Sequence, residues 1–428
     1  MKKYTAMNPK ELRSELAAVT AEYNRIKKGD RQLNMARGKP NPSQLDLSMS
    51  MLAQSPSDLI STRKGTDVRN YGELAGVDEC KEMFAELLGL KPDNIIMGGQ
   101  SSLNLMYDSI VRALLLGVYG GSKPWGQQGE LKFLCPVPGY DRHFAICQEF
   151  GIQMINIPMG EHGPDMAMVR ELVESDPAVK GIWCVPKYAN PSGITYSDDV
   201  VRAFAALKPA ADDFRIFWDN AYLVHGFRDE DDKLMNIFDA CRECGSEDMV
   251  YEFTSTSKIT FSGAGLAVLA ASENNVKFIL KQMGIQTIGY DKINQLRHVN
   301  FFHNADGIRA HMKKHATIIA PKFDCVLGAL DEEIAPRGVG TWPTPRGGYF
   351  VGFRGLPGTA KRTVSLCKDA GLTLTGAGAP FPYGIDPEDS TIRIAPTFPN
   401  VFELTAAMKL FCVAVRIAAL EALLAEKE

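Results

Sequence analysis

Between residues 70 and 300, short apolar runs alternate with segments that have the apolar period of helices. The runs are apolar throughout, which is typical of strands buried on both faces of a sheet. Strands separated by helices favour a mainly parallel sheet with a helical layer on each side. The expected strands are Asn94–Met97, Phe133–Cys135, Met154–Ile157, Gly181–Val185, Arg215–Trp218 and Val250–Phe253.

The two ends of the chain predict a second, smaller unit. Residues 9–28 and Ile308–Leu330 have helical periods, Gly347–Val351 is expected to be a strand, and Leu404–Lys427 a last helix. We therefore predict the α/β class. A large three-layer domain at 51–305 holds a mainly parallel sheet, and a smaller α+β domain at 306–428 is completed by an N-terminal arm at 1–50.

Composition excludes several classes of partner. A net charge of −4 over 428 residues disfavours nucleic acid and anionic membrane surfaces, and no apolar run is long enough to span a bilayer. Nine scattered cysteines fit reduced thiols in a cytoplasmic enzyme. Cys241 and Cys244 form the one CxxC pair, and no second pair lies near enough to complete a zinc site, so we expect no metal.

Lys258 follows the apolar run Val250–Phe253 after a stretch of small hydroxyl residues. A lysine at the end of a buried strand loses solvation, which lowers its pKa and leaves a neutral amine that can condense with an aldehyde. Ser255 and Ser257 offer groups that hold a phosphate. An aldehyde that carries a phosphate is pyridoxal 5′-phosphate, although an isolated Ser-x-Ser-Lys is more often a solvated strand end.

Asp219 stands where the run Arg215–Trp218 ends. A buried carboxylate there keeps a pyridinium nitrogen protonated, while a helix N-cap is the alternative role. Tyr222 and Asn190, the latter in an Asn-Pro-x-Gly turn, can both reach the phenolic oxygen of the cofactor.

A glycine turn joins the first expected strand to an apolar helix. Free N–H groups at a helix N-terminus bind phosphate, and a bare helix start is the alternative. The candidate residues in this turn are Gly99, Gln100 and Ser101.

Three further residues complete the candidate site. Tyr140, on a Pro/Gly turn, can lie against the cofactor ring, and His143 can hydrogen-bond Asp219 from behind or serve only in packing. Arg393 lies within an apolar strand, where its planar fork suits a substrate α-carboxylate. An internal salt bridge is the alternative.

The order Asn-Pro-x-Gly, Asp-x-x-Tyr, Ser-x-Ser-Lys and C-terminal Arg resembles the fold-type I, class I pyridoxal-phosphate aminotransferases over nearly the whole chain. The resemblance implies that Lys258 binds the cofactor's aldehyde and that Asp219 contacts its ring nitrogen. It further implies that Tyr222 and Asn190 contact the phenolic oxygen, that Tyr140 lies over the ring, and that Arg393 and Asn190 bind the substrate.

The same resemblance extends to the assembly. Tyr71 is similar to a tyrosine that reaches the phosphate of the partner subunit, which implies a homodimer with shared active sites. Gly38 stands in the segment that closes over the substrate. The amino-acid sequences of Gly98–Met106 and Ala379–Gly384 are similar to those of a bacterial, MocR-like group of aspartate aminotransferases.

One departure is Leu266, where the family usually has an arginine that balances the phosphate charge. Aspartate and 2-oxoglutarate also need a second cation for the distal carboxylate. The candidates are Arg142, which we favour, Lys292 and Arg37.

The expected reaction moves an amino group between an amino acid, with aspartate favoured, and 2-oxoglutarate. Two alternatives keep the cofactor set and change the pocket: an aromatic aminotransferase and a cysteine-conjugate β-lyase. A cofactor-binding transcriptional regulator would need a basic helix-turn-helix ahead of the catalytic domain, and residues 1–50 hold about one helix.

Overall fold

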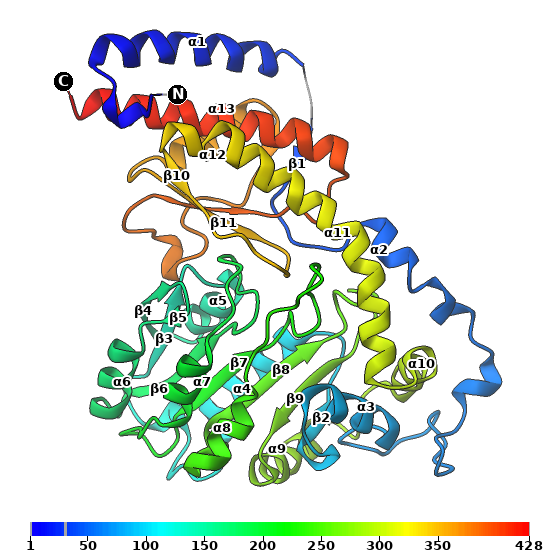
Figure 1. The fold of residues 1–428 in the computed structure, drawn as a ribbon. Coiled ribbons are helices and arrows are strands. Elements are labelled where there is room, and N and C mark those ends of the chain that lie inside the picture. Colours follow the sequence, from blue (N-terminus) through cyan, green and yellow to red (C-terminus); the bar gives the residue numbers. More distant parts are fainter. Residues whose placement is uncertain (1, 30–31, 428) are drawn as a thin grey trace.

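The computed structural model describes residues 2–29 and 32–427 and is built around an eight-stranded sheet (Figure 1). Strands β8, β7, β6, β3 and β4 run parallel, and β9 is antiparallel to both of its neighbours. The predicted α/β class is confirmed. In sheet order the strands are β2 (Ile95–Met97), β9 (Ala267–Ala271), β8 (Val250–Ser255), β7 (Arg215–Asp219), β6 (Val179–Cys184), β3 (Lys132–Val137), β4 (Gln153–Gly160) and β5 (Gly163–Pro164).

Helices cover both faces of this sheet, which is why its central strands are apolar throughout. One face packs against α4 (Ser102–Leu116), α5 (Asp141–Glu149) and α9 (Glu273–Gln286). The other packs against α6 (Met166–Ser175), α7 (Asp198–Ala205) and α8 (Ile237–Cys244), and beside β2 and β9 against α3 (Asp78–Leu88) and α10 (Lys292–Phe302).

A smaller body lies on the carboxyl-end side of the large sheet (Figure 1). It holds the antiparallel sheet β10 (Gly340–Thr341), β11 (Val351–Gly355) and β13 (Thr391–Ile394), and the parallel pair β1 (Leu33–Asn34) and β12 (Leu372–Thr373). Since β1 belongs to the N-terminal segment, the two ends of the chain build this body together. Its helices are α11 (Ala305–Glu333), α12 (Ala360–Asp369) and α13 (Val401–Ala425).

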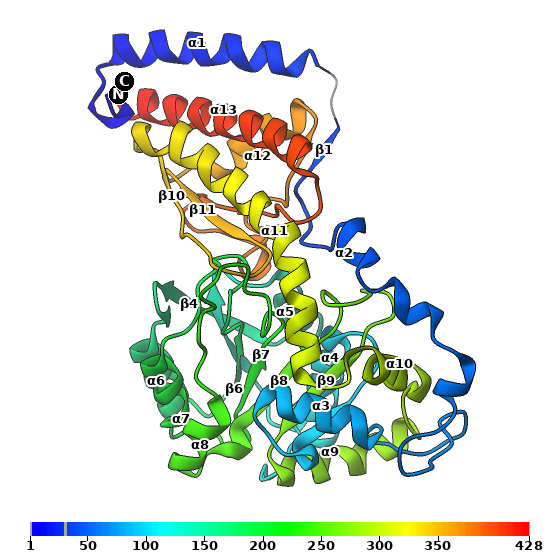
Figure 2. The ribbon, with the colours of Figure 1, turned by 45° about the vertical axis from the view of Figure 1, so that its right-hand side comes forward.

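The first helix, α1 (Pro9–Lys27), lies along α13 in both views (Figure 2). Asn8 begins it with a capping box, in which its side chain accepts from the Glu11 N–H and the Glu11 carboxylate accepts from the Asn8 N–H. A short helix, α2 (Pro42–Asp46), follows β1 on the way to the large sheet. Within the described ranges, no helix combines the length and apolar character needed to cross a membrane.

The long helices at 9–28, 308–330 and 404–427 were predicted to within a few residues, but the predicted strand Gly347–Val351 is wrong. The strand begins only at Val351. A Cβ on Gly347 would lie 2.2 Å from the Tyr188 ring, and Gly348 has a φ of +82°, so these glycines form a close-packed turn. The division at residues 50 and 305 stays our proposal for the domain boundaries.

Glu252, in the middle of β8, predicts a pH dependence of stability. Its one hydrogen bond is accepted from Asn220 Nδ2 at 2.8 Å, and burial raises its pKa to about 7. The raised pKa makes the folded state most stable below the ordinary pKa of 4.5, and that stability is lost as the pH rises through 7.

Glu252→Gln should therefore gain on the order of 2 kcal/mol over the wild type at about pH 8 and little at about pH 5. Urea unfolding at both pH values measures this. Glu243→Gln, at an exposed position of α8, is the control and should shift neither value. Equal gains at both pH values would show that Glu252 is not the titrating group.

Candidate active site

A cleft of about 540 Å³ lies at the carboxyl ends of the large-sheet strands, between the two bodies. This is the edge at which an open α/β sheet presents its ligand site. Eleven of the predicted site residues line it: Gly38, Ser101, Tyr140, Arg142, Asn190, Asp219, Tyr222, Ser255, Ser257, Lys258 and Arg393.

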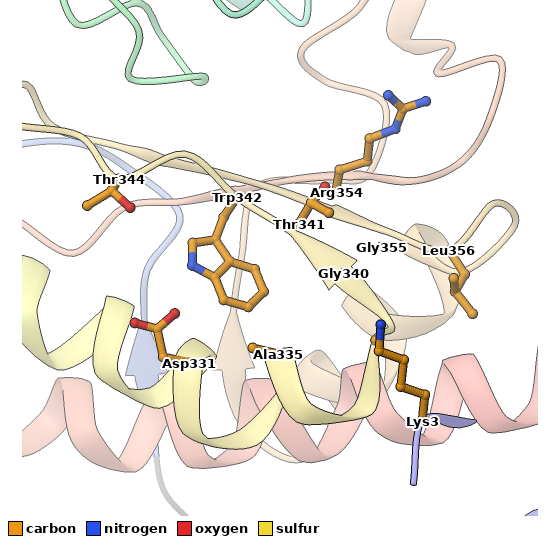
Figure 3. Close-up of a pocket in the computed structure, with 11 residues that line it drawn as sticks. Lys3, Asp331, Ala335, Gly340, Thr341, Trp342, Thr344, Arg354, Gly355 and Leu356 are labelled. Carbon is orange, nitrogen blue, oxygen red and sulfur yellow. The ribbon is translucent and has the colours of Figure 1, made fainter. Parts of the chain in front are cut away.

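A second hollow of about 780 Å³ lies on the smaller body, between the end of α11 and the β10–β11 hairpin. Figure 3 shows Trp342 over Asp331 of α11 and Ala335 just after that helix, with Arg354 at the rim. None of the predicted site residues lines it, so its size does not make it the catalytic candidate.

The Lys258 amine lies between two aromatic rings in the cleft. Its Nζ is 5.1 Å from the centroid of Tyr222 and 5.9 Å from that of Tyr349. Burial lowers the pKa of Lys258, while the negative charge of Asp219 acts in the opposite direction. The amine is therefore more readily deprotonated than a surface lysine, as its position after β8 indicated.

Asp219, the last residue of β7, has one oxygen paired and one free. His143 Nε2 lies 3.0 Å from its Oδ2, and the His143 ring stacks on Trp183 with centroids 4.5 Å apart. Its Oδ1 is buried and has no hydrogen-bond partner among the described residues. A buried acceptor without a partner is costly, so this oxygen requires a donor from a ligand, and a protonated ring nitrogen fits that requirement.

Hydroxyl groups form a cup beside Lys258. Ser255 Oγ donates to Ser257 Oγ at 3.1 Å, Ser257 Oγ also lies 3.1 Å from the Gln100 carbonyl, and Ser262 Oγ donates to the Ser257 carbonyl at 2.6 Å. Ser101 is the N-cap of α4, and its side chain makes no capping hydrogen bond. This cup of hydroxyls at a helix N-terminus fits a phosphate.

Leu266 belongs to the core and not to this cup. It is 2% exposed among the apolar residues of α3, β2 and β9, and its N–H donates to Thr256 Oγ1 at 2.8 Å. The arginine that the family usually has at this position is thus replaced by a leucine that packs in the core.

Arg393, on β13, reaches the cleft from the smaller sheet. Its Nη1 lies 3.1 Å from Asp141 Oδ1 and 3.3 Å from Asn190 Oδ1, and its Nη2 donates to Thr375 Oγ1 at 3.1 Å. The guanidinium carbon is 5.0 Å from the centroid of the Phe350 ring. Arg393 therefore lines the cleft, and it also forms the internal salt bridge that was its alternative role.

Sequence reasoning missed Asp141, Thr375 and Phe350. A signal existed for Asp141, which stands between the candidates Tyr140 and Arg142. No motif marks Thr375 or Phe350, since their positions follow from how the smaller sheet folds over the larger one.

Five candidates lie outside the cleft lining: Gly99, Gln100, Tyr71, His143 and Lys292. His143 contacts Asp219 from behind, as described above. Lys292 Nζ donates to the Gly72 carbonyl at 3.2 Å, and the Tyr71 side chain is 81% exposed. Of the three candidate cations for a distal carboxylate, Arg142 and Arg37 line the cleft within one chain.

A buried amine, a buried carboxylate with a free oxygen and a buried arginine converge in one cleft at the carboxyl edge of an α/β sheet. This combination is typical of an enzyme that acts on small carboxylates. A family model described as aspartate aminotransferase matches residues 7–427, and the chain belongs to this family. It is an aminotransferase.

Two of its similar proteins come from Corynebacterium glutamicum. An aspartate aminotransferase is 43% identical over 403 residues, which cover 94% of this chain and 93% of that protein. The crystal structure of an aspartate transaminase has a TM-score of 0.96 at 41% identity and covers 99% of both chains. The α-aminoadipate aminotransferase of Thermus thermophilus, solved with N-(5′-phosphopyridoxyl)-L-leucine, shares the fold, with a TM-score of 0.72 at 18% identity over 92% of this chain and 93% of that one.

Gly38 yields a test of the N-terminal cleft wall. A Cβ at this position would lie 2.4 Å from Cζ of Phe350. The guanidinium of Arg393 packs over the ring of Phe350. Gly38→Ala should displace the segment or the ring and lower kcat/KM for the amino donor about ten-fold. Gly328→Ala, on α11 where an added Cβ meets nothing within 4 Å, is the control and should leave steady-state kinetics unchanged.

Proposed function

We propose that this enzyme transfers the amino group of aspartate to 2-oxoglutarate and uses pyridoxal 5′-phosphate held at Lys258. The observation that carries the proposal is the free, buried Oδ1 of Asp219 in the same cleft as the Lys258 amine and the Arg393 guanidinium. The similarity to the Corynebacterium glutamicum aspartate aminotransferase supports the choice of amino donor.

Five residues would hold the cofactor ring. Asp219 Oδ1 accepts from the ring nitrogen, and Tyr222 and Asn190 donate to the phenolic oxygen. Burial raises the pKa of Tyr222 well above its usual value, so it stays a phenol that can donate. Tyr140 would pack against the ring, and Lys258 would bind the aldehyde. When bound, the cofactor withdraws electrons from the substrate's Cα, which makes the Cα proton removable.

The phosphate would lie in the hydroxyl cup. Ser101, Ser255 and Ser257 are its proposed ligands, and the turn Gly99–Gln100 places the N-terminus of α4 beside them. Tyr71 is proposed to reach the phosphate of the partner subunit. Its 81% exposure within one chain is consistent with a role across an interface.

The chain's own groups then bind substrate and move one proton. Arg393 pairs with the α-carboxylate, Asn190 lies beside it, and the segment that carries Gly38 closes the cleft. The Lys258 amine, whose pKa burial lowers, would take up the proton from the substrate's Cα.

The wider setting is also part of the proposal. A homodimer with shared sites is supported by exposed apolar side chains on the large domain, namely Leu52, Tyr71, Ile285 and Ile288. A cytoplasmic location is supported by nine cysteines that are all free. The likeness of two segments to the MocR-like group supports placing the chain there.

Replacing Lys258 by Ala tests the central assignment. The variant should lose the visible absorbance of lysine-bound cofactor and at least about three orders of magnitude in kcat, because no amine remains to move the Cα proton. Absorption spectra and glutamate formation measure the two effects. Lys277→Ala, at an exposed lysine of α9, is the control. Near-native turnover, or a borohydride-reduced adduct at another peptide, would refute the role of Lys258.

Arg142→Ala tests the distal cation. If Arg142 binds the side-chain carboxylate of aspartate, its removal should raise the KM for aspartate about ten-fold or more and leave the KM for alanine nearly unchanged. Arg37→Ala is the matched comparison, since Arg37 also lines the cleft. If Arg37→Ala raises the KM for aspartate more than Arg142→Ala does, Arg37 binds the distal carboxylate. If Arg142→Ala raises the KM for aspartate and for alanine equally, Arg142 does not bind it.

Product analysis separates the alternatives. Stoichiometric glutamate from 2-oxoglutarate with an aromatic donor preferred over aspartate would indicate an aromatic aminotransferase, and pyruvate and ammonia from a cysteine conjugate would indicate a β-lyase. The regulator alternative required a helix-turn-helix near the start of the chain. Instead, α1 packs along α13 and belongs to the smaller body.

A further inference from the structure

The guanidinium of Arg393 is already engaged by the protein's own acceptors. Nη1 faces Asp141 and Asn190, and Nη2 faces Thr375, while Nε is buried with no hydrogen-bond partner in the described part of the chain. Asn190 and Thr375 are neutral. Among the described residues, Asp141 is the one carboxylate within salt-bridge distance of Arg393.

Asp141 meets Arg393 inside the cleft and across the boundary between the two bodies. It is the first residue of α5 on the large sheet, whereas Arg393 lies on β13 of the smaller sheet, and both line the cleft. The Asp141 side chain is 36% exposed against 7% for Arg393. The carboxylate can therefore turn toward solvent, while the guanidinium cannot.

A buried guanidinium needs an anion, because an unpaired charge in such a site is costly. An incoming α-carboxylate bonds best in a two-pronged arrangement that uses two N–H groups of the fork. The bond to Asp141 occupies Nη1, which is one of the groups that such a carboxylate would need. Two anions therefore compete for the same part of Arg393.

We propose that Asp141 is an internal substitute for the substrate α-carboxylate. It pairs with Arg393 while the cleft holds no substrate, and it is displaced when a carboxylate ligand binds. The inference rests on the proposed function in one respect, since it takes Arg393 as the site of the α-carboxylate.

This exchange has two consequences for specificity. Every carboxylate ligand loses part of its attraction to Arg393 by having to displace Asp141, so KM values are raised for amino and oxo acids alike. A ligand that lacks the α-carboxylate cannot replace Asp141 and leaves the ion pair in place. Asp141 is thus a specificity-determining residue that favours ligands with an α-carboxylate over simple amines.

The test compares the wild-type holoenzyme with Asp141→Asn, which keeps the size of the side chain and removes its charge. The dissociation constant of succinate, measured by titration calorimetry, should fall by about three- to thirty-fold. The KM for aspartate should fall by a similar factor. The change in kcat should be smaller and downward, because the product also carries an α-carboxylate and leaves more slowly.

Asp324→Asn is the matched control, because it breaks a partly exposed ion pair between Asp324 of α11 and Arg228, neither of which lines the cleft, and should change none of these values. If Asp141→Asn does not fold, Asp141→Ser removes the same charge and suits the start of a helix. Weaker or unchanged succinate binding with either variant would overturn the proposal and show that Asp141 only orients Arg393.

The two proposals fail in distinguishable ways. Succinate binding reports on Asp141 whether or not turnover occurs. If the wild type forms no glutamate from aspartate and 2-oxoglutarate, the proposed function fails. If it does, and succinate binding does not respond to Asp141, only the present inference fails.

Discussion

The buried pair of Asp219 and His143 is the interaction on which the cleft depends. A carboxylate that is removed from water is costly unless its oxygens are satisfied. Oδ2 is satisfied by His143, whose ring is fixed by stacking on Trp183, and Oδ1 is left for a ligand. The pair also explains why the centre of the sheet is where the chemistry lies. β7, which ends at Asp219, has parallel neighbours on both sides, so its last residue is enclosed by the turns that follow β6 and β8.

The smaller body contributes to the same cleft through its own polar network. Gln44 of α2 is fully buried, and its Nε2 lies 3.0 Å from Tyr349 Oη and 3.1 Å from His315 Nδ1. Tyr349 Oη in turn donates to the Lys258 carbonyl at 3.4 Å. Burial lowers the pKa of His315 to about 4, so the network is neutral near physiological pH. The N-terminal segment is thereby fixed to the turn that carries Lys258, which explains why an arm far away in sequence can form a wall of the cleft.

Local sequence patterns predicted most of the features that depend on neighbouring residues alone. Apolar runs located the six expected strands, and the residues that follow three of them identified Asn190, Asp219 and Lys258 before any contact was known. The rest depends on tertiary packing. The alanine-rich strand β9 has no distinctive period, and Gly347 is a glycine because of the Tyr188 ring, which is remote in sequence. Asp141 and Thr375 contact Arg393 only because the smaller sheet lies over the end of α5. The spacing of residues in the sequence does not predict that arrangement.

The charge balance of the cleft connects these observations. Leu266 lies in the core, so the cup is formed by serine hydroxyls and the N-terminus of α4, which together suit an anion such as phosphate. Arg37, Arg142 and Arg393 line the cleft beside Lys258, against the carboxylates of Asp141 and Asp219. Oδ1 of Asp219 is buried without a partner among the described residues, and Asp141 is the carboxylate that pairs with Arg393. A dicarboxylate substrate therefore enters a cleft in which Arg393 is paired with Asp141, whereas Arg37 and Arg142 line the cleft with no ion pair among the described residues. Under the proposals above, the α-carboxylate would replace Asp141 at Arg393, whereas the distal carboxylate would add an anion at an exposed arginine.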